Sequence, residues 1–542
     1  MSRPDGLPVP ARTRHLRRGP DPAATRGPAR PEARPDDGQH LSHLAAGDCR
    51  RPDAGAHAAR EPDAAAQVLA RLEGAGAGPP VKVLVVGGGW AGLAAAVQAC
   101  QEGHEVTLIE ATRHWGGRAR ALALQDAAGH CLRLDNGQHI LIGAYTATLG
   151  LMETVGVDLS RALLDLPLGL PFPDGLGLTT PAWAARWPAP LDALAAMTTA
   201  RGWSWHDRLA LLRRSLAWRL RGFRCLPTDT VADVCRDLPR RTMQDLIEPL
   251  CVSALNLPPA QASGQVFLRV LRDALFGQGH GALRPAHLLL PRHDLGMLMP
   301  AKAVDWLRAR GVDARTGARA MALRRGEAGW AVSVREDGAV RTEHADHVIL
   351  ASSAEVAGQL VRDAATSVTP GQARSLLAWA DQAQGLPHTA IATVYARSPS
   401  ARLPAPMLAL RPGGTAGDLS ASLSAQFVFD RGQLHPDDPV MQGVLAFVVS
   451  ASPDDRVALE TAVIAQGRQQ LGLDQLTPIR TVVERRATFA CLPALARPPA
   501  RIADGLTAAA DYVDGPYPAT IEGAVRSGRQ AASDLGRRHG LS

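Results

Sequence analysis

Residues 81–120 constrain the fold more than any other part of the chain, and they read VKVLVVGGGWAGLAAAVQACQEGHEVTLIEATRHWGGRAR. Residues 81–86 are a short, mostly β-branched run, typical of a strand buried on both faces of a parallel sheet. A helix is expected over residues 93–102, ending at Gly103, and a second strand over residues 105–109. The order of strand, glycine-rich turn, helix and strand predicts a parallel sheet that begins here.

The turn after the first strand carries the pattern G-x-G-x-x-G at Gly87, Gly89 and Gly92. The first glycine permits a tight turn, the second lets the backbone approach a pyrophosphate, and the third lets the helix pack on the strand. Ala91 belongs to the same expected binding turn, and the helix N-terminus favours the phosphate charge. Glu110, about 20 residues further on, can accept the hydroxyls of a ribose. The combination predicts a Rossmann-like dinucleotide site; a glycine-rich turn without a ligand is the alternative.

The composition indicates which broad class of protein the chain belongs to. The 542 residues are enough for two or three domains, and the hydrophobic content of 46% is that of a globular protein. No apolar run approaches the ~20 residues of a spanning helix, and no signal peptide is apparent. The seven cysteines are scattered without a C-x-x-C pair, which argues for a reducing cytoplasm, against a metal site and against a disulfide framework. The net charge of +7 comes with no nucleic-acid-binding motif, so no nucleic acid partner is expected.

Residues 1–80 differ from the rest of the chain. They are rich in proline and arginine and have almost no periodic apolar pattern. Such a segment buries too little apolar surface to offset its ordering entropy. We therefore expect a disordered extension, with the folded protein starting at Val81.

The segment after Glu110 indicates which dinucleotide binds. Its sequence, HWGGRA over residues 114–119, resembles the G-G-R segment of the flavin amine oxidase and phytoene desaturase superfamily. The resemblance implies FAD as the cofactor, with Gly117 and Arg118 lying along its pyrophosphate. A plain turn with a solvated Arg118 is the alternative.

Three further segments resemble the same superfamily. The sequence DNGQH at residues 135–139 is expected under the isoalloxazine, where Gly137 would allow close backbone approach. Ala320, after a returning strand, would hold the adenine through its backbone. Near the C-terminus, Asp511 would meet the pyrophosphate or ribityl chain. The amides of Thr520 and Ile521 would face the flavin N1/O2 edge and stabilise negative charge there.

The expected architecture is α/β. A Rossmann-like FAD-binding domain of the amine oxidase type is interleaved with an α+β substrate domain. The expected divisions are the extension at 1–80, FAD-binding parts at 81–150, 301–360 and 491–542, a helical substrate-domain part at 151–300 that faces a membrane, and a β-rich substrate-domain part at 361–490.

A basic stretch lies within the helical part. Residues 201–224 hold seven arginines and one aspartate, and leucines recur near helical spacing at positions 209, 212, 216 and 220. A basic amphipathic helix with neighbouring tryptophans suits an anionic membrane surface. A packed helix with solvated arginines is the alternative. The expected location is the cytoplasm, with peripheral contact at the inner face of the cytoplasmic membrane.

Five segments resemble the hydroxysqualene dehydroxylase family: residues 135–145, 248–259, 267–273, 288–295 and 518–528. The family implies that hydroxysqualene, a long-chain isoprenoid, loses its allylic hydroxyl and gains a hydride to give squalene for hopanoid synthesis. Such chemistry needs an acid for the leaving hydroxyl. His139 is the first candidate, Asp135 the second and Asp294 the third; a structural role is open for each.

Other functions remain open from the sequence alone. A carotenoid or squalene desaturase would use the same fold in the oxidising direction. An amine or porphyrinogen oxidase, and a non-catalytic isoprenoid-binding protein that keeps FAD, are further alternatives. The electron donor is also open, because no second dinucleotide motif is apparent.

Overall fold

A computed structural model describes residues 79–125, 129–413, 423–453 and 455–535. The expected disordered extension lies outside the described residues, apart from positions 79 and 80. Among the described residues, five cysteines are free thiols. Cys131 is disulfide-bonded, which the scattered cysteines did not indicate.

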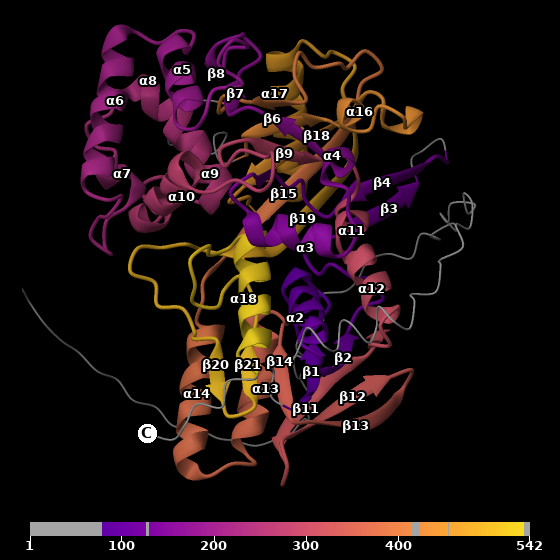
Figure 1. The fold of residues 1–542 in the computed structure, drawn as a ribbon. Coiled ribbons are helices and arrows are strands. Elements are labelled where there is room, and N and C mark those ends of the chain that lie inside the picture. The colour runs from indigo at the N-terminus through magenta and orange to yellow at the C-terminus, as the bar shows by residue number, and fades with distance from the viewer. Residues whose placement is uncertain (1–78, 126–128, 414–422, 454, 536–542) are drawn as a thin grey trace, which may run out of the picture. The chain divides into compact units, whose positions relative to one another are not determined.

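A six-stranded sheet forms the base of the fold, in the order β10-β2-β1-β14-β21-β20 (Figure 1). Its neighbours pair in parallel except β20 and β21, which are antiparallel. The strands come from three distant stretches of the chain, so the sheet closes only when all three are present. They are β1 (Lys82–Val86), β2 (Glu105–Glu110), β10 (Asp313–Thr316), β14 (His347–Leu350), β20 (Arg501–Ala503) and β21 (Leu506–Ala508).

Both faces of this sheet are buried, as the apolar run of β1 predicts. Val83 and Val85 belong to one apolar cluster with the helices α2 (Trp90–Gln101) and α18 (Ile521–Ser533). Leu84 and Val86 point the other way, because successive strand residues alternate, and they belong to a second cluster. The sheet is therefore the middle layer of three.

Helices α2 and α18 pack side by side on one face of the sheet (Figure 1). Their contact depends on a small residue, since a Cβ at Gly528 would lie 2.1 Å from the carbonyl oxygen of Ala91. This contact brings the C-terminal helix onto the helix of the glycine turn.

The opposite layer contains a three-stranded antiparallel sheet of β11 (Arg319–Arg325), β12 (Trp330–Glu336) and β13 (Ala339–Ala345). Neighbouring strands of this sheet pair antiparallel, and Ala320 lies within β11. Helices α13 (Ala354–Ala365) and α14 (Pro370–Gln384) pack nearby.

The β-rich part is a five-stranded antiparallel sheet in the order β16-β17-β18-β15-β19. Helix α17 (Arg456–Leu471) separates β18 from β19 in the sequence. The strands of this sheet are β15 (His388–Arg397), β16 (Met407–Ala409), β17 (Phe427–Asp430), β18 (Val444–Ser450) and β19 (Thr477–Phe489).

The region of residues 151–300 is mainly helical, as expected, with short strand pairs that the sequence did not indicate. Its helices include α5 (Leu191–Thr199), α6 (Trp205–Leu220), α7 (Val231–Val234), α9 (Glu248–Leu255), α10 (Gly264–Phe276) and α11 (Leu295–Leu298). Its strands are β6 (Leu163–Leu166), β7 (Gly169–Pro171), β8 (Gly177–Thr179) and β9 (Leu288–Pro291). No helix in the described part of the chain is both long and apolar enough to cross a bilayer.

Candidate flavin site

The three glycines of the turn have different surroundings. Gly87 has a φ of +118°, and a Cβ there would lie 2.5 Å from the carbonyl oxygen of Ala351. A Cβ at Gly92 would lie 1.8 Å from the carbonyl oxygen of Gly87. A Cβ at Gly89 would meet nothing closer than the Cα of Gly117, at 3.9 Å. Packing therefore requires glycine at the first and third positions, whereas the second faces open space that a ligand can use.

Helix α2 begins directly at this open space. Gly89 is its N-cap, and no side chain caps the first turn. The first amides of an α-helix have no partner within the helix, and they carry the positive end of its dipole. An uncapped N-terminus beside an open glycine turn is suited to a phosphate group.

Glu110 ends β2 beside the turn and is buried, with 8% of its surface exposed. Its Oε2 accepts a hydrogen bond from the Gly88 amide at 2.7 Å, and its Oε1 accepts one from the Thr112 amide at 2.8 Å. Its carbonyl oxygen accepts from the Ala318 amide at 2.9 Å, which places the segment leading to Ala320 alongside. The residues expected at the ribose and the adenine are therefore neighbours.

The G-G-R segment folds back onto the glycine turn. The Gly116 amide donates to the Gly88 carbonyl at 2.9 Å, and the Trp90 indole donates to the Ala119 carbonyl at 3.1 Å. The Arg118 guanidinium reaches across to Asp511, which follows β21, in an ion pair of 2.5 Å. The two ends of the expected pyrophosphate site are thus joined.

Helix α18 begins with a capped first turn. The Thr520 hydroxyl accepts from the Gly523 amide at 3.0 Å and donates to the Tyr517 carbonyl at 2.9 Å. Glu522 is fully buried and accepts from the Thr148 amide at 2.9 Å, at the start of α3 (Thr146–Thr154). Ile521 is the first helical residue. These bonds fix the helix terminus that was expected to face the flavin.

Asp135 lies in a buried network. Its carboxylate accepts from Arg431 at 3.0 Å and from the Leu295 amide at 2.7 Å. The Tyr395 hydroxyl donates to the Asp135 carbonyl at 2.8 Å. Burial raises the pKa of Asp135, and the charge of Arg431 opposes that shift. Because both carboxylate oxygens are engaged, this geometry favours a positioning role over proton transfer.

His139 is half-buried, and its Nδ1 lies 2.7 Å from the Gly137 carbonyl oxygen. Burial lowers its pKa, so the ring is neutral near pH 7 and is a poor proton donor. Asp294 caps α11 through the Met297 amide and pairs with Arg133 at 3.2 Å, so its carboxylate is also occupied. A Cβ at Gly137 would meet only the His139 ring, at 3.8 Å, which leaves the expected approach to the flavin open.

Flavin dinucleotide fits these residues on three observations: the open space at Gly89, the uncapped start of α2 and the carboxylate of Glu110 at the end of β2. Arg118 and the N-terminus of α18 would add positive charge beside the phosphates and the reduced flavin if the cofactor binds as expected. Among the described residues, no group of histidine, cysteine or acidic side chains could hold a metal ion.

Three polar residues near the start of α18 were not indicated by any sequence pattern. Tyr145, Tyr517 and Asp273 line a small cavity that also contains Thr520. The three come from segments far apart in the sequence, and no spacing motif joins them. The sequence offered one indication of a site here: Tyr517 stands three residues before Thr520, which was expected near the flavin.

Comparison with known protein families identifies the family to which the chain belongs. The model of the family described as flavin containing amine oxidoreductase matches residues 90–536. The chain belongs to this family. As an FAD-dependent oxidoreductase, it has the cofactor class that the glycine turn and the G-G-R segment indicated.

Curated relatives of this oxidoreductase include two hydroxysqualene dehydroxylases. The protein from Rhodopseudomonas palustris is 28% identical over 83% of this chain and 97% of its own length. The one from Sinorhizobium fredii is 28% identical over 84% of this chain and 98% of its own. The resemblance noted in the sequence is confirmed, and it extends over nearly the whole of both relatives.

This oxidoreductase is also similar to one protein of solved structure and, over a short segment, to a desaturase. An oxidoreductase of solved structure from Methanosarcina mazei superposes with a TM-score of 0.60 at 15% identity, covering 84% of this chain and 100% of the other, which confirms the fold class. The zeta-carotene desaturase of Zea mays is 36% identical over 81 residues, covering 15% of this chain and 14% of its own length.

Proposed function

We propose that this oxidoreductase removes the allylic hydroxyl of hydroxysqualene and forms squalene. The observation that supports this proposal most strongly is the sequence similarity to hydroxysqualene dehydroxylases. The alignments cover 97–98% of the length of those proteins. Family membership alone would leave the substrate open.

The reaction makes three demands on the protein. Bound in its reduced form, the flavin would supply a hydride for the carbinol carbon. The chain has to hold that cofactor, and the glycine turn, Glu110, Arg118 and the start of α18 are the residues proposed for this. It also has to supply an apolar space for the isoprenoid chain and a proton for the leaving hydroxyl.

The electron donor is proposed to be external. The dinucleotide motif at Gly87–Gly92 is assigned to FAD, and the sequence offers no second one. A separate redox protein or a transiently bound nicotinamide would then reduce the flavin.

A desaturase of the carotenoid type is the second candidate, because zeta-carotene desaturases share local identity with this chain. The same cofactor site would serve a hydride transfer in the opposite direction. The shortness of that match, 15% of this chain, favours the dehydroxylase.

One anaerobic experiment separates the two candidates. The full chain with bound flavin is reduced with dithionite and mixed with hydroxysqualene, and the lipids are extracted. We expect squalene in an amount equal to the flavin reoxidised. Oxidised enzyme that desaturates squalene or phytoene, with no squalene from the reduced enzyme, would instead support the desaturase.

We also propose that the enzyme docks on an anionic membrane through α6, where a water-insoluble C30 substrate resides. Trp205, Leu209, Leu216 and Leu220 form an exposed stripe at helical spacing, with 70% of Trp205 and 79% of Leu220 accessible. Leu211 and Trp218, on the other side of the helix, are buried.

The positive charge on and beside α6 supports an anionic membrane as the partner. The exposed arginines 213 and 219 lie on the same helix as the stripe, and exposed Arg221 is its C-cap. Helix α6 lies at the edge of the helical region (Figure 1). Basic side chains beside exposed leucine and tryptophan suit an interface with anionic lipid.

A further inference from the structure

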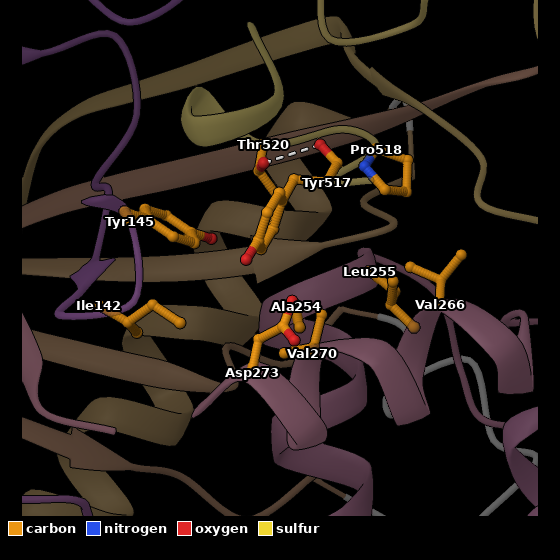
Figure 2. A pocket seen from close by; sticks show the side chains of 10 residues that line it. All are labelled: Ile142, Tyr145, Ala254, Leu255, Val266, Val270, Asp273, Tyr517, Pro518 and Thr520. Carbon is orange, nitrogen blue, oxygen red and sulfur yellow. Dashed lines mark hydrogen bonds between the residues drawn. The ribbon is translucent and has the colours of Figure 1, made fainter. Parts of the chain in front are cut away.

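A small cavity opens at the start of α18, the helix terminus assigned to the flavin (Figure 2). Its walls are mostly apolar and come from β5 (Leu141–Ile142), α9, α10 and the turn before α18. Polar groups gather at one end, where Figure 2 shows the hydroxyls of Tyr145 and Tyr517 pointing into the same space near Asp273. The cavity has a volume of about 10 Å³, roughly the room that one water needs, so it could receive the hydroxyl end of a substrate but not its hydrocarbon chain.

Asp273 holds the polar end together. It accepts from Arg269 at 2.6 Å and from Arg272 at 2.9 Å, and it also accepts a hydrogen bond from the Tyr517 hydroxyl. Burial alone would raise the pKa of Asp273, but these hydrogen bonds outweigh it and lower the pKa. The carboxylate is therefore ionised and acts only as an acceptor, so the proton of the pair resides on Tyr517.

Two arginines lie over the ring of Tyr517. The guanidinium carbon of Arg526 is 4.9 Å from the centre of that ring, and that of Arg269 is 5.6 Å away. Burial and the charge of Asp273 raise the pKa of Tyr517 to about 12, so the phenol is neutral at rest. Both guanidiniums would stabilise the phenolate that forms if the proton leaves.

Tyr145 completes the polar end. Its ring meets that of Tyr517 edge-on, with 6.3 Å between the ring centres, and its hydroxyl hydrogen-bonds to Thr520. Burial raises the pKa of Tyr145 above its ordinary value, so this phenol is also neutral. Two neutral phenols thus lie at the polar end of the cavity. Each hydrogen-bonds to a different protein group, Tyr517 to Asp273 and Tyr145 to Thr520, so a substrate oxygen would have to replace those acceptors.

We propose that Tyr517 is the proton donor to the departing hydroxyl of an allylic isoprenoid alcohol, that Tyr145 hydrogen-bonds to the same oxygen, and that Asp273 is a positioning residue. The proposal rests on the proposed dehydroxylation. The carbon–oxygen bond breaks with its electron pair on oxygen, and the Tyr517 proton moves to that oxygen to give water. The carbinol carbon receives a hydride from reduced flavin, which ends oxidised, and a solvent proton restores Tyr517.

The direction of proton transfer is favourable. A phenol titrates near pH 10 in water, whereas water itself has a pKa of about 15.7. The proton is therefore transferred downhill to a departing hydroxide, even with the pKa of Tyr517 at about 12. The neutral His139 imidazole has no acidic proton of comparable strength.

The test uses Tyr517→Phe, with Tyr512→Phe as the matched control. Tyr512 is a buried neighbour whose hydroxyl has no hydrogen-bond partner among the described residues. Flavin content and thermal unfolding first establish that each variant folds. In anaerobic single turnover of hydroxysqualene, we expect Tyr517→Phe to slow squalene formation by about 10²–10⁴-fold, and Tyr512→Phe to leave it unchanged.

A substrate with a better leaving group distinguishes a proton-donating role of Tyr517 from a purely structural one. The acetate ester of hydroxysqualene needs no proton to depart, so Tyr517→Phe should convert it at nearly the wild-type rate. A variant equally slow with both substrates would overturn the assignment. Wild-type enzyme that makes no squalene would instead overturn the proposed function.

Binding to the oxidised enzyme gives a readout independent of turnover. Tyr517→Phe and Tyr145→Phe should each weaken binding of hydroxysqualene about 5-fold, the worth of one hydrogen bond, and leave squalene binding unchanged. Equal binding of hydroxysqualene by wild type and both variants would show that neither phenol contacts the hydroxyl.

Discussion

Arg118 and Asp511 form an ion pair of 2.5 Å although 393 residues separate them in the chain. Arg118 follows the segment that packs on the glycine turn, and Asp511 follows β21. The pair therefore links the N-terminal and C-terminal parts of the proposed flavin site.

We expect this pair to affect flavin retention more than global stability, because Arg118 is partly exposed and exposed pairs contribute little to folding. Asp511→Asn and Arg118→Ala should each weaken flavin binding about 5- to 30-fold. In a double-mutant cycle read by flavin release, the double variant should lose less than the sum of the two single losses. The exposed pair of Arg362 and Asp381 is the control, and its removal should leave flavin binding unchanged. Additive losses would show that the pair does not act as a unit.

The second glycine and the ribose carboxylate should control flavin content. Gly89→Val fills the open space above the turn, and Glu110→Ala removes the carboxylate at the end of β2, so both variants should purify with little flavin. Gly103→Ala is a control for backbone effects at a glycine with open surroundings and a positive φ. Absorbance at the flavin bands gives the occupancy. Full occupancy in Gly89→Val would exclude the glycine turn as the pyrophosphate site.

The buried pair of Asp135 and Arg431 should matter mainly for stability. Arg431→Met leaves an uncompensated carboxylate in the interior, so the free energy of unfolding should fall by about 3–5 kcal/mol. Adding Asp135→Asn removes that charge and keeps an acceptor for the Leu295 amide, so the double variant should be more stable than Arg431→Met. Urea unfolding measures both. A double variant less stable than the single one would contradict this account.

His347 should make stability depend on pH. Burial, with the nearby His104, lowers its pKa to about 4, below the value of about 6.5 in an unfolded chain. Between these values the unfolded chain binds the proton, so the free energy of unfolding falls as the pH drops from about 6.5 to 4. At pH 5 this amounts to about 2 kcal/mol. Urea unfolding of His347→Gln should show a smaller loss between pH 7 and pH 5 than wild type; an equal loss would assign the dependence to other groups.

Charge reversal on α6 should weaken membrane binding. Arg214 pairs with Asp237 and is mostly buried, so Arg213 and Arg221, which are exposed, are the informative positions. Each basic residue near an anionic surface contributes about 1 kcal/mol, so Arg213→Glu with Arg221→Glu should lower partitioning onto anionic vesicles at least about 30-fold.

Apolar substitutions test the stripe itself. Leu209→Ser and Leu216→Ser should lower binding to anionic vesicles further, because each removes a side chain that would insert among the lipids. Val457→Ser, at an exposed apolar residue on α17, should not. Unchanged sedimentation of all α6 variants with vesicles would leave α6 as an ordinary surface helix.

Much of the parallel sheet could be predicted, because its information is local. The run of residues 81–86, the spacing of three glycines and the position of Glu110 each specify backbone geometry over a few residues. The start of the C-terminal helix could also be predicted, because Thr520 is a typical N-cap residue and small residues follow it.

Contacts between distant segments could not be predicted. Asp135 appeared as a possible acid because its segment lies near the expected flavin, but its partner Arg431 stands 296 residues further on. The pair of Tyr517 and Asp273 was missed for the same reason, since no spacing rule links a loop residue to the end of a helix. Burial and pairing decide the protonation of such groups, and both depend on tertiary structure.

The order of the strands has a consequence for biosynthesis. The ribosome releases β1 and the glycine turn early, but β21, Asp511 and α18 only after residue 506 has been made. Between the synthesis of β14 and that of β21 the nascent chain holds an unfinished sheet edge at β14, and until Asp511 is made it lacks the partner of Arg118. We therefore expect flavin to be retained only late in synthesis or after it, and a truncated product that ends before β21 to leave the edge of β14 unpaired.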